Sequence, residues 1–391
     1  MEDIPVHVMV DILSRLHVKT IIHCKCVCKK WLHLVSDSYF INLHLSRSPV
    51  GLMIYHYSEK ELMGHPRLRV LKWVEVKDDV NHHHLHHDPL MSLDLNLASI
   101  FQDSQILLMG SVNGLICLWQ VCPKSDNIYI CNPITREYMI LPTQQYHGKG
   151  YAINVHCFGV SLLSHEYKVI RIFQRVLILP RNITSSSSSS SEPSLLEAEV
   201  YTLGTGQWRS LGHVAYKING FHGPYLNGHA HWSIVVDQDS VEEIYAFDFD
   251  KETFKLFPSP PVETIQGSRF HFRTLAVVKG CLCQSDTFDS QFTMWVMKEY
   301  GVKKSWEKEV IIKKSISQNL DWLMSGPIYP IERLHDGTIL MVYYQDKLLI
   351  YSPKGRTVAN SELFDNCVSG MPYCPSFLKL QNFESERVYV F

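Results

Sequence analysis

The chain has 391 residues and a formal net charge of −2 at pH 7, with 37 basic residues against 39 acidic ones. This balance gives no overall field that would attract nucleic acid or an anionic membrane, so we expect neither as a partner. Apolar residues make up 46% of the chain, which allows a sizeable core, and the length suggests one small unit plus one large unit.

The N-terminus and the cysteines indicate the cellular compartment. Glu2 and Asp3 stand where a secretory signal would carry basic residues, and no run of about 18 apolar residues occurs. We therefore expect the protein in the cytoplasm, the nucleus or both. The 11 cysteines contain no CxxC pair, which argues against a zinc finger and a disulfide framework. We expect reduced thiols, most of them buried.

Residues 4–45 carry the strongest helical pattern of the chain. Apolar residues recur there in two stripes at helical spacing, through Val8, Ile12, Leu13 and Leu16 and through Ile21, Cys24, Cys28, Trp31 and Val35. The stripes predict two short amphipathic helices, followed by a short third segment. About 42 residues cannot bury enough surface for a core of their own. Either another protein covers this apolar surface, or the helices pack on the rest of the chain.

From about Gly51 onward the pattern changes to short apolar runs separated by turn residues, which predicts successive strands. A turn glycine followed by a strand recurs at intervals of roughly 50 residues or twice that spacing. These glycines are Gly114, Gly228, Gly280 and Gly337. A degenerate repeat made of strands is typical of a β-propeller with kelch-like blades.

The predicted fold class is therefore α+β and multidomain, with a small helical domain at residues 1–46 and an all-β kelch-like propeller at residues 47–391. Low-complexity segments at 81–88, rich in histidine, and at 184–193, rich in serine, are predicted to be loops at the propeller rim. The apolar run at Glu386–Phe391 predicts a terminal strand in the same sheet as Gly51–Tyr57, or its neighbour, which would close the ring.

A specific motif lies within the helical segment. Its residues are Ile4-Pro5, Val8, Ile12-Leu13, Leu16, Val18-Lys19, the run Cys26-Val27-Cys28-Lys29-Lys30-Trp31, Leu34-Val35 and Tyr39-Phe40. This pattern resembles the F-box motif along its whole length, with Ile4 replacing the usual leucine at similar volume. In F-box proteins this segment binds the Skp1 adaptor, which is held by the cullin scaffold of an SCF ubiquitin ligase, and the rest of the chain presents a substrate.

The resemblance implies a set of contacts and a second domain. The residues it assigns to Skp1 binding are Ile4, Pro5, Val8, Ile12, Leu13, Leu16, Val27, Cys28 and Trp31. The remaining chain resembles the F-box-associated, kelch-like domains of plant F-box proteins, through Val112–Cys117, Cys131–Arg136, His231-Trp232 and Ala246–Asp248. The resemblance implies a non-catalytic subunit without a cofactor. Its partners would be a Skp1-like adaptor, through it cullin and a RING protein, and a protein substrate whose identity is unknown.

The sequence also contains a weak indication of metal binding. His229 and His231 alternate on a predicted strand and could begin a cupin-like metal site, but no further ligands accompany them, so packed or hydrogen-bonded histidines are the simpler interpretation. A kelch-like enzyme of galactose-oxidase type would need a copper site of Tyr, His and Cys that the sequence does not assemble. A third alternative is a Skp1-bound scaffold that directs no degradation.

Shortening the run Ser185–Ser191 to two residues should leave the melting temperature nearly unchanged. The reason is that the entropy of closing a loop varies only with the logarithm of its length. Thermal unfolding followed by circular dichroism measures the effect. A loss of several degrees would show instead that the tract packs or binds.

Overall fold

The computed structural model describes residues 4–57, 69–74, 93–96, 105–122, 125–142, 150–176, 196–220, 223–235, 242–262, 265–313, 321–344, 347–360, 367–383 and 386–390. The segments 81–88 and 184–193 lie outside the described residues, so both loop assignments stay predictions. The chain forms two compact units, residues 1–141 with 330–391, and residues 142–329. No helix in the described part is long and apolar enough to cross a membrane.

The α-helices of the described residues all lie at the start of the first unit. They are α1 (Val6–Leu13), α2 (Val18–Cys24), α3 (Lys29–Val35) and α4 (Ser38–Arg47). The second predicted helix is wrong in one respect, because Cys28 is extended at φ −161° and splits it into α2 and α3. Asp37 caps α4 by accepting a hydrogen bond from the Tyr39 amide at 2.9 Å.

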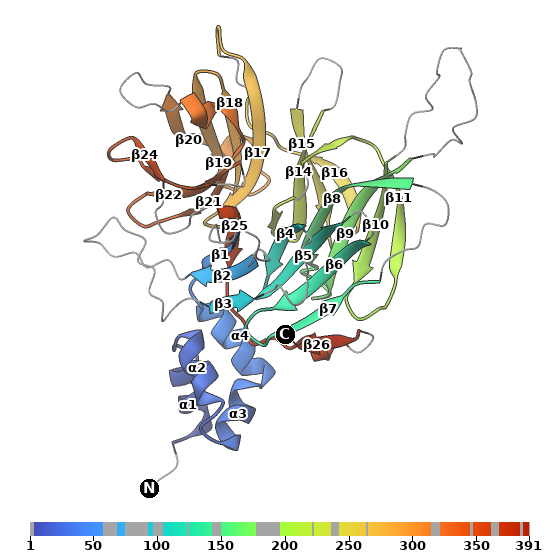
Figure 1. Cartoon of the computed structure of the whole chain (residues 1–391), viewed down its shortest axis with the longest axis vertical. Coiled ribbons are helices and arrows are strands. Elements are labelled where there is room, and N and C mark those ends of the chain that lie inside the picture. Colours follow the sequence, from blue (N-terminus) through green and yellow to red (C-terminus); the bar gives the residue numbers. More distant parts are fainter. Residues whose placement is uncertain are drawn as a thin grey trace, which may run out of the picture. The chain divides into compact units, whose positions relative to one another are not determined.

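The helices and strands of the first unit share one hydrophobic core. Leu13, Ile21, Val35 and Phe40 belong to a buried cluster that also contains strand residues such as Tyr55. Figure 1 shows the helices grouped below strands β1 to β3, with α4 adjoining them. Packing on the rest of the chain, one of the two alternatives for the helical apolar surface, therefore accounts for its inner side.

Two antiparallel sheets lie wholly in the first unit. The first has the order β25-β1-β2-β3 and consists of β1 (Gly51–Tyr57), β2 (Arg69–Val74), β3 (Leu93–Asn96) and β25 (Cys367–Tyr373). The second has the order β26-β7-β6-β5-β4 and consists of β4 (Gln105–Val112), β5 (Leu115–Cys122), β6 (Ser125–Asn132), β7 (Glu137–Ile140) and β26 (Val388–Val390).

A further sheet begins at the boundary of the two units and continues in the first. It has the order β21-β22-β23-β24 and consists of β21 (Ile328–Arg333), β22 (Ile339–Tyr343), β23 (Lys347–Ser352) and β24 (Thr357–Asn360). Leu340, Val342 and Leu348 of this sheet share a buried cluster with Leu52 and Ile54 of β1.

The second unit holds three sheets. One consists of β8 (Gly150–Val160), β9 (Tyr167–Val176), β10 (Leu196–Thr202) and β11 (Trp208–Val214). The next consists of β12 (Ile218–Asn219), β13 (Tyr225–Leu226), β14 (His229–Val235), β15 (Glu242–Asp248) and β16 (Thr253–Phe257). The last consists of β17 (Phe270–Val278), β18 (Cys281–Phe288), β19 (Gln291–Met297) and β20 (Trp306–Lys313).

Six sheets of four or five strands are thus present among the described residues, and apart from β25 and β26 each sheet is built from strands that follow one another in the chain. Small antiparallel sheets of this size form the blades of β-propellers. The predicted fold class, a small helical domain followed by an all-β propeller, is confirmed. The kelch assignment of the blades and the domain limits at residues 46 and 47 stay predictions. Short 3-10 helices are η2 (Lys303–Ser305), η3 (Asp321–Ser325) and η4 (Leu380–Asn382).

Three of the four predicted turn glycines, Gly114, Gly228 and Gly280, occupy two-residue hairpin turns, whereas Gly337 lies in a longer connection between β21 and β22. Asn113 and Gly114 have φ of +51° and +82°, and Asn227 and Gly228 have φ of +47° and +74°. Two successive residues with positive φ are the requirement of a two-residue turn whose twist matches that of the flanking strands. Asn-Gly satisfies this requirement with little strain, which explains why the glycines mark the repeat so regularly.

The predicted terminal strand forms, but the strand that pairs with β1 comes from an earlier segment of the chain. The strand next to β1 is β25, with Met53 opposite Met371. The terminal strand β26 does form, but it pairs with β7 and extends the second sheet. The apolar pattern could not make this distinction, because it marks a segment as a strand but does not identify the strand with which it pairs.

A buried ion pair lies across β9 and β10. Arg171 donates from Nη2 to Oε2 of Glu199 at 2.7 Å and from Nε to the same oxygen at 3.0 Å. The guanidinium carbon lies 4.3 Å from the ring centre of Trp208. On the other side His156 faces Arg171, and burial, aided by this positive charge, lowers the pKa of His156 to about 3. His156 is therefore neutral, and Glu199 balances the arginine charge.

Arg171→Leu should lower the free energy of unfolding by about 3–5 kcal/mol, because it leaves the Glu199 carboxylate buried without this countercharge. The double substitution Arg171→Leu with Glu199→Leu should lower it by less than the single one. Denaturant unfolding of both variants provides the measurement. Equal losses in the two variants would contradict the coupling.

Candidate functional site

The helices present an apolar outer side to solvent. Large exposed apolar residues within this segment are Ile4, Val6, Val8, Ile12, Val27, Leu32 and Tyr39, which we call the outer helical face. Ile12 is 50% exposed and Val27 is 64% exposed, whereas Leu13, the neighbour of Ile12, is only 3% exposed. Successive residues point about 100° apart on a helix, so one side of α1 packs inward and the other remains open.

The residues predicted to bind an adaptor divide between these two sides. Ile4, Pro5, Val8, Ile12, Val27 and Cys28 are exposed. Leu13 is buried, and Leu16 and Trp31 are partly buried against the core. Their docking role stays a prediction. For Leu13 the structure identifies a packing role, so a substitution there would test folding as well as docking.

The residues assigned to Skp1 binding from the sequence did not include the exposed Val6, Leu32 and Tyr39, although Tyr39 belongs to the motif. A stripe of apolar residues marks the side of a helix that is buried, but it does not distinguish burial in the same chain from burial under a partner. A sequence signal for these residues is the presence of apolar residues on more than one side of each short helix. Short helices that are apolar on more than one side need a second covering surface.

Polar contacts fix the helices that carry this face. Arg47 at the end of α4 donates from Nη1 to Oδ1 of Asp11 in α1 at 2.8 Å and to Oγ of Ser14 at 2.6 Å. Arg15 also pairs with Asp11, at 3.1 Å. Hydrogen bonds from Arg15 and Arg47 lower the pKa of the Asp11 carboxyl, which is charged at neutral pH. The first and last helices are thereby held together.

An open apolar surface of this kind has a clear chemical use. Contiguous apolar patches are rare on isolated soluble proteins because they remain in contact with water at a cost in free energy. Ile4, Val8 and Ile12 are spaced four residues apart, and the latter two lie on one side of α1. The arrangement suits docking of helices against an apolar groove of another protein.

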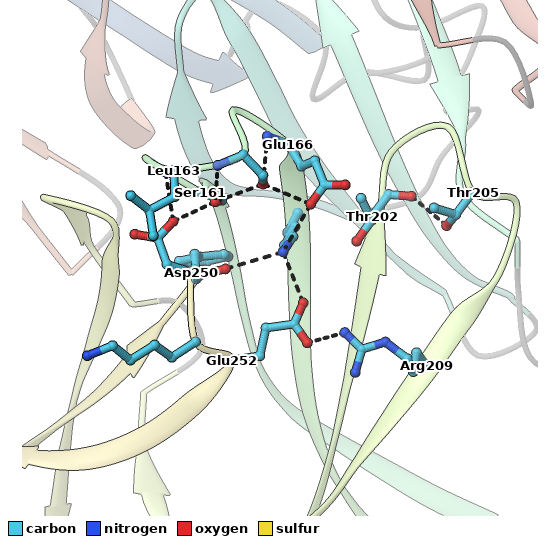
Figure 2. Close-up of polar contacts among 12 residues, drawn as sticks. Ser161, Leu163, Glu166, Thr202, Thr205, Arg209, Asp250 and Glu252 are labelled. Atoms are coloured by element: carbon cyan, nitrogen blue, oxygen red, sulfur yellow. Dashed lines mark hydrogen bonds and ion pairs between the residues drawn. The ribbon is translucent and has the colours of Figure 1, made fainter.

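A second surface, in the other unit, consists of turns joined by polar contacts (Figure 2). Ser161 Oγ and the Leu163 amide both donate to Oδ1 of Asp250, which links the β8–β9 turn to the β15–β16 turn. Glu252 accepts hydrogen bonds from Lys168 and from Arg209, which adds the start of β11. We call this set of contacts the turn network.

The turn network holds an exposed apolar tip in place. Leu163 is 81% exposed, yet its amide is hydrogen-bonded to Asp250 at 3.0 Å. Burial raises the pKa of the Asp250 carboxyl, but hydrogen bonds from Ser161 and backbone amides outweigh it, so the pKa is lowered overall. Lys168 donates to the Phe249 carbonyl as well as to Glu252. These groups act as supports, and the tip they present can contact a partner.

The two histidines considered as metal ligands have other partners. His231 is buried and hydrogen-bonded to the Tyr300 hydroxyl at 2.9 Å through Nε2 and to the Pro224 carbonyl at 3.2 Å through Nδ1. Burial lowers the pKa of His231 to about 3, so the ring is neutral. His229 is bonded to the Asn227 carbonyl through Nδ1. Within the described ranges no group of three or more His, Cys, Asp or Glu is placed to hold a metal ion.

Some of the cysteines are buried, as expected, and others are exposed. Cys24, Cys117, Cys131, Cys157 and Cys283 are buried free thiols. Cys26 and Cys28 are exposed, although Cys28 belongs to a predicted apolar stripe, because they lie in the turn that separates α2 from α3. A helical stripe drawn through Cys24 and Cys28 does not anticipate this break.

Comparisons with known proteins identify both parts of the chain. A family model described as F-box-like matches residues 1–44, and one described as an F-box associated beta propeller domain matches residues 69–345. In Arabidopsis thaliana, the F-box protein At3g07870 is 27% identical over 382 residues, covering 90% of this chain and 86% of the relative. The F-box protein CPR1, also from Arabidopsis thaliana, is 27% identical over 341 residues, covering 80% and 74%.

A third Arabidopsis thaliana relative spans nearly the whole chain. The F-box/kelch-repeat protein At3g23880 is 23% identical over 407 residues, covering 99% of this chain and 94% of the relative. Among solved structures, TolB of Acinetobacter baumannii has a TM-score of 0.41 at 14% identity, covering 87% of this chain and 71% of that one, too remote a likeness to support an argument.

Asp250→Ala should loosen the β8–β9 turn without unfolding the sheet. The substitution removes the acceptor of the Ser161 hydroxyl and the Leu163 amide, and each hydrogen bond contributes about 1 kcal/mol. Hydrogen–deuterium exchange should therefore become faster at Leu163, while the global melting temperature changes little. Lys251→Ala, at an exposed neighbouring position, is the control. Unchanged exchange at Leu163 would show that the turn network does not hold the tip.

Proposed function

The chain belongs to the F-box proteins that carry an F-box-associated β-propeller domain, and we propose that it is the substrate-recognition adaptor of an SCF (Skp1–cullin–F-box) ubiquitin ligase. The observation that carries the proposal is the outer helical face, an open apolar surface in the part of the chain that matches the F-box model. Its relatives include F-box proteins of Arabidopsis thaliana, which supports a plant F-box protein.

The proposal divides the work between the two parts of the chain. Residues 1–46 dock a Skp1-like adaptor, and through it the cullin and the RING protein. The β-rich residues 47–391 hold a target protein of unknown identity. The chain needs no catalytic group or cofactor of its own for this role, and it acts in the cytoplasm, the nucleus or both.

Proximity supplies the chemical effect of such an adaptor. A target held at one end and a ubiquitin-charged carrier enzyme held at the other become parts of one complex, which raises the effective concentration of target lysines. The contribution of this chain is affinity and geometry. The neutral His231 and the ion-paired Arg171, Glu199 and Lys168 are accounted for by packing and hydrogen bonding.

The proposed docking is apolar and helical. Val8 and Ile12 would enter a groove of the adaptor together with Val27, and the desolvation of their side chains would supply affinity. Leu13 and Val35 hold the helices from the inside. Residues on the outer helical face should thus affect binding without affecting folding, and core residues should affect both.

Ile12→Asp should weaken Skp1 binding by about 2 kcal/mol or more, a roughly 30-fold increase in Kd, because it places a charge in a desolvated interface. The melting temperature should be unchanged, since Ile12 is 50% exposed. Isothermal titration of the purified chain with Skp1 measures the effect.

The matched control is Leu256→Asp, because Leu256 is also 50% exposed but lies on β16 of the other unit. It should bind Skp1 as the parent chain does. Equal affinities for both variants would reject the outer helical face as the docking site. The half-life of a captured target, with and without this chain, separates a degradative adaptor from a scaffold.

A further inference from the structure

A segment near the C-terminus contacts the helices. It comprises residues 374–382, between β25 and β26, and we call it the strap. The Cys374 thiol donates to the carbonyls of Leu45 and Ser48, each at 3.6 Å. The buried ring of Phe377 lies 5.2 Å from the ring of His44 in α4. One side of the strap is therefore fastened to the last helix.

A cation–π contact joins the strap to the end of helix α2. Lys25, which follows α2, places its Nζ 4.3 Å from the centre of the Phe377 ring, within the range of a cation–π contact. Burial, and secondarily the charge of Lys379, lowers the pKa of Lys25. The ring face and the Glu137 charge offset part of the cost of removing this ammonium group from water.

The opposite side of the strap is fastened to the second sheet. Asn132 at the end of β6 donates from Nδ2 to the carbonyls of Ser376 at 3.0 Å and Leu378 at 2.6 Å. Glu137 at the start of β7 accepts from the Leu380 amide at 2.7 Å. We call Asn132 and Glu137 the socket.

The socket is built to hold backbone. Asn132 is fully buried, and its Oδ1 accepts from the Ile134 amide at 2.9 Å, so both ends of its side chain are engaged. Gly114 leaves room for the strap, since a Cβ there would lie 2.2 Å from Cβ of Ser376. The buried Asn132 amide donates hydrogen bonds to two carbonyls of the strap and so fixes its position. Breaking these hydrogen bonds would leave polar groups buried without partners.

The helices would otherwise depend on one short covalent connection. Only residues 48–50 separate α4 from β1. A single covalent connection keeps the helices close to the strands, but it does not prevent the helices from rotating relative to them. The shared core and a second attachment restrict this rotation. The strap is that second attachment, and it comes from a part of the chain more than 300 residues later.

We propose that the strap and its socket set the orientation of the helices on the second sheet, and that Asn132 and Glu137 are positioning residues for ubiquitin transfer. This role rests on the proposed function. An adaptor raises the effective concentration of a lysine only when it holds that lysine within reach of the carrier enzyme. If the helices can move relative to the sheets, the lysine samples a larger volume and its effective concentration falls. The socket would thus affect where ubiquitin is attached, without touching Skp1, the target or ubiquitin.

The first test measures orientation directly on the full chain, both alone and with Skp1 added. Spin labels introduced as unnatural amino acids at the exposed positions His23 in α2 and Arg356 between β23 and β24 report the distance between helices and sheets. Asn132→Ala should broaden the distance distribution. Asn127→Ala should not, because Asn127 lies on the same strand but donates to Gln120.

The second test measures ubiquitin transfer. The full chain is assembled with Skp1, cullin, RING protein and a ubiquitin-charged carrier, and ubiquitin attached to the chain's own lysines is mapped by mass spectrometry. Asn132→Ala should spread the modification over more lysines and slow it several-fold at the preferred ones, with Skp1 affinity within twofold of the parent. A residue that merely stabilises the fold would not change the pattern of sites in a folded, Skp1-bound chain.

The outcomes separate the two proposals. If the parent chain fails to bind Skp1, the proposed function fails, whereas the distance measurement still decides whether the strap orients the helices. An unchanged distance distribution in Asn132→Ala, or a broadened one with an unchanged pattern of modified lysines, would overturn the positioning role. Should Asn132→Ala lose cooperative unfolding, Glu137→Leu, which removes the acceptor of the Leu380 amide, is measured in its place under the same criteria.

Discussion

The shared core of helices and strands is the constraint on which the first unit depends. Val35 and Phe40 of the helices are fully buried, and they belong to one cluster with Tyr55 of β1 and Phe377 of the strap. A helical group of this size cannot remove enough apolar surface from water by itself. By packing its inner side on the strands it becomes stable, and its outer side is left for a partner.

The order of the elements could be predicted from the sequence, since the helical stripes and the Asn113-Gly114 turn follow from local rules. Long-range pairings could not. The contacts of Asn132 with Ser376 and Leu378 join residues more than 240 positions apart, and no local pattern marks them. The break at Cys28 depends on how the following helix packs, and the outer helical face depends on which of two apolar sides is covered.

Buried polar groups in this chain support shape. Arg171 with Glu199, and Arg273 with Asp286 at 2.7 Å, place each charge against its counterpart on the adjacent strand. At the turns, Asp250 and Glu252 accept hydrogen bonds from Ser161 and Lys168 and so hold neighbouring segments together. Sheets stiffened in this way provide fixed turns, and fixed turns such as the one at Leu163 contact a partner with little loss of conformational freedom.

The pairing of β1 with β25 has a consequence for how the protein is made. Residues 51–57 are synthesised about 300 residues before their neighbour in the sheet, residues 367–373. Until then β1 has one open edge, and the helical core lacks Phe377. The sheet and the helical core are therefore completed only after residue 377 has been synthesised, and synthesis interrupted before that point yields fragments with an exposed strand edge, the kind of surface that chaperones and proteases recognise.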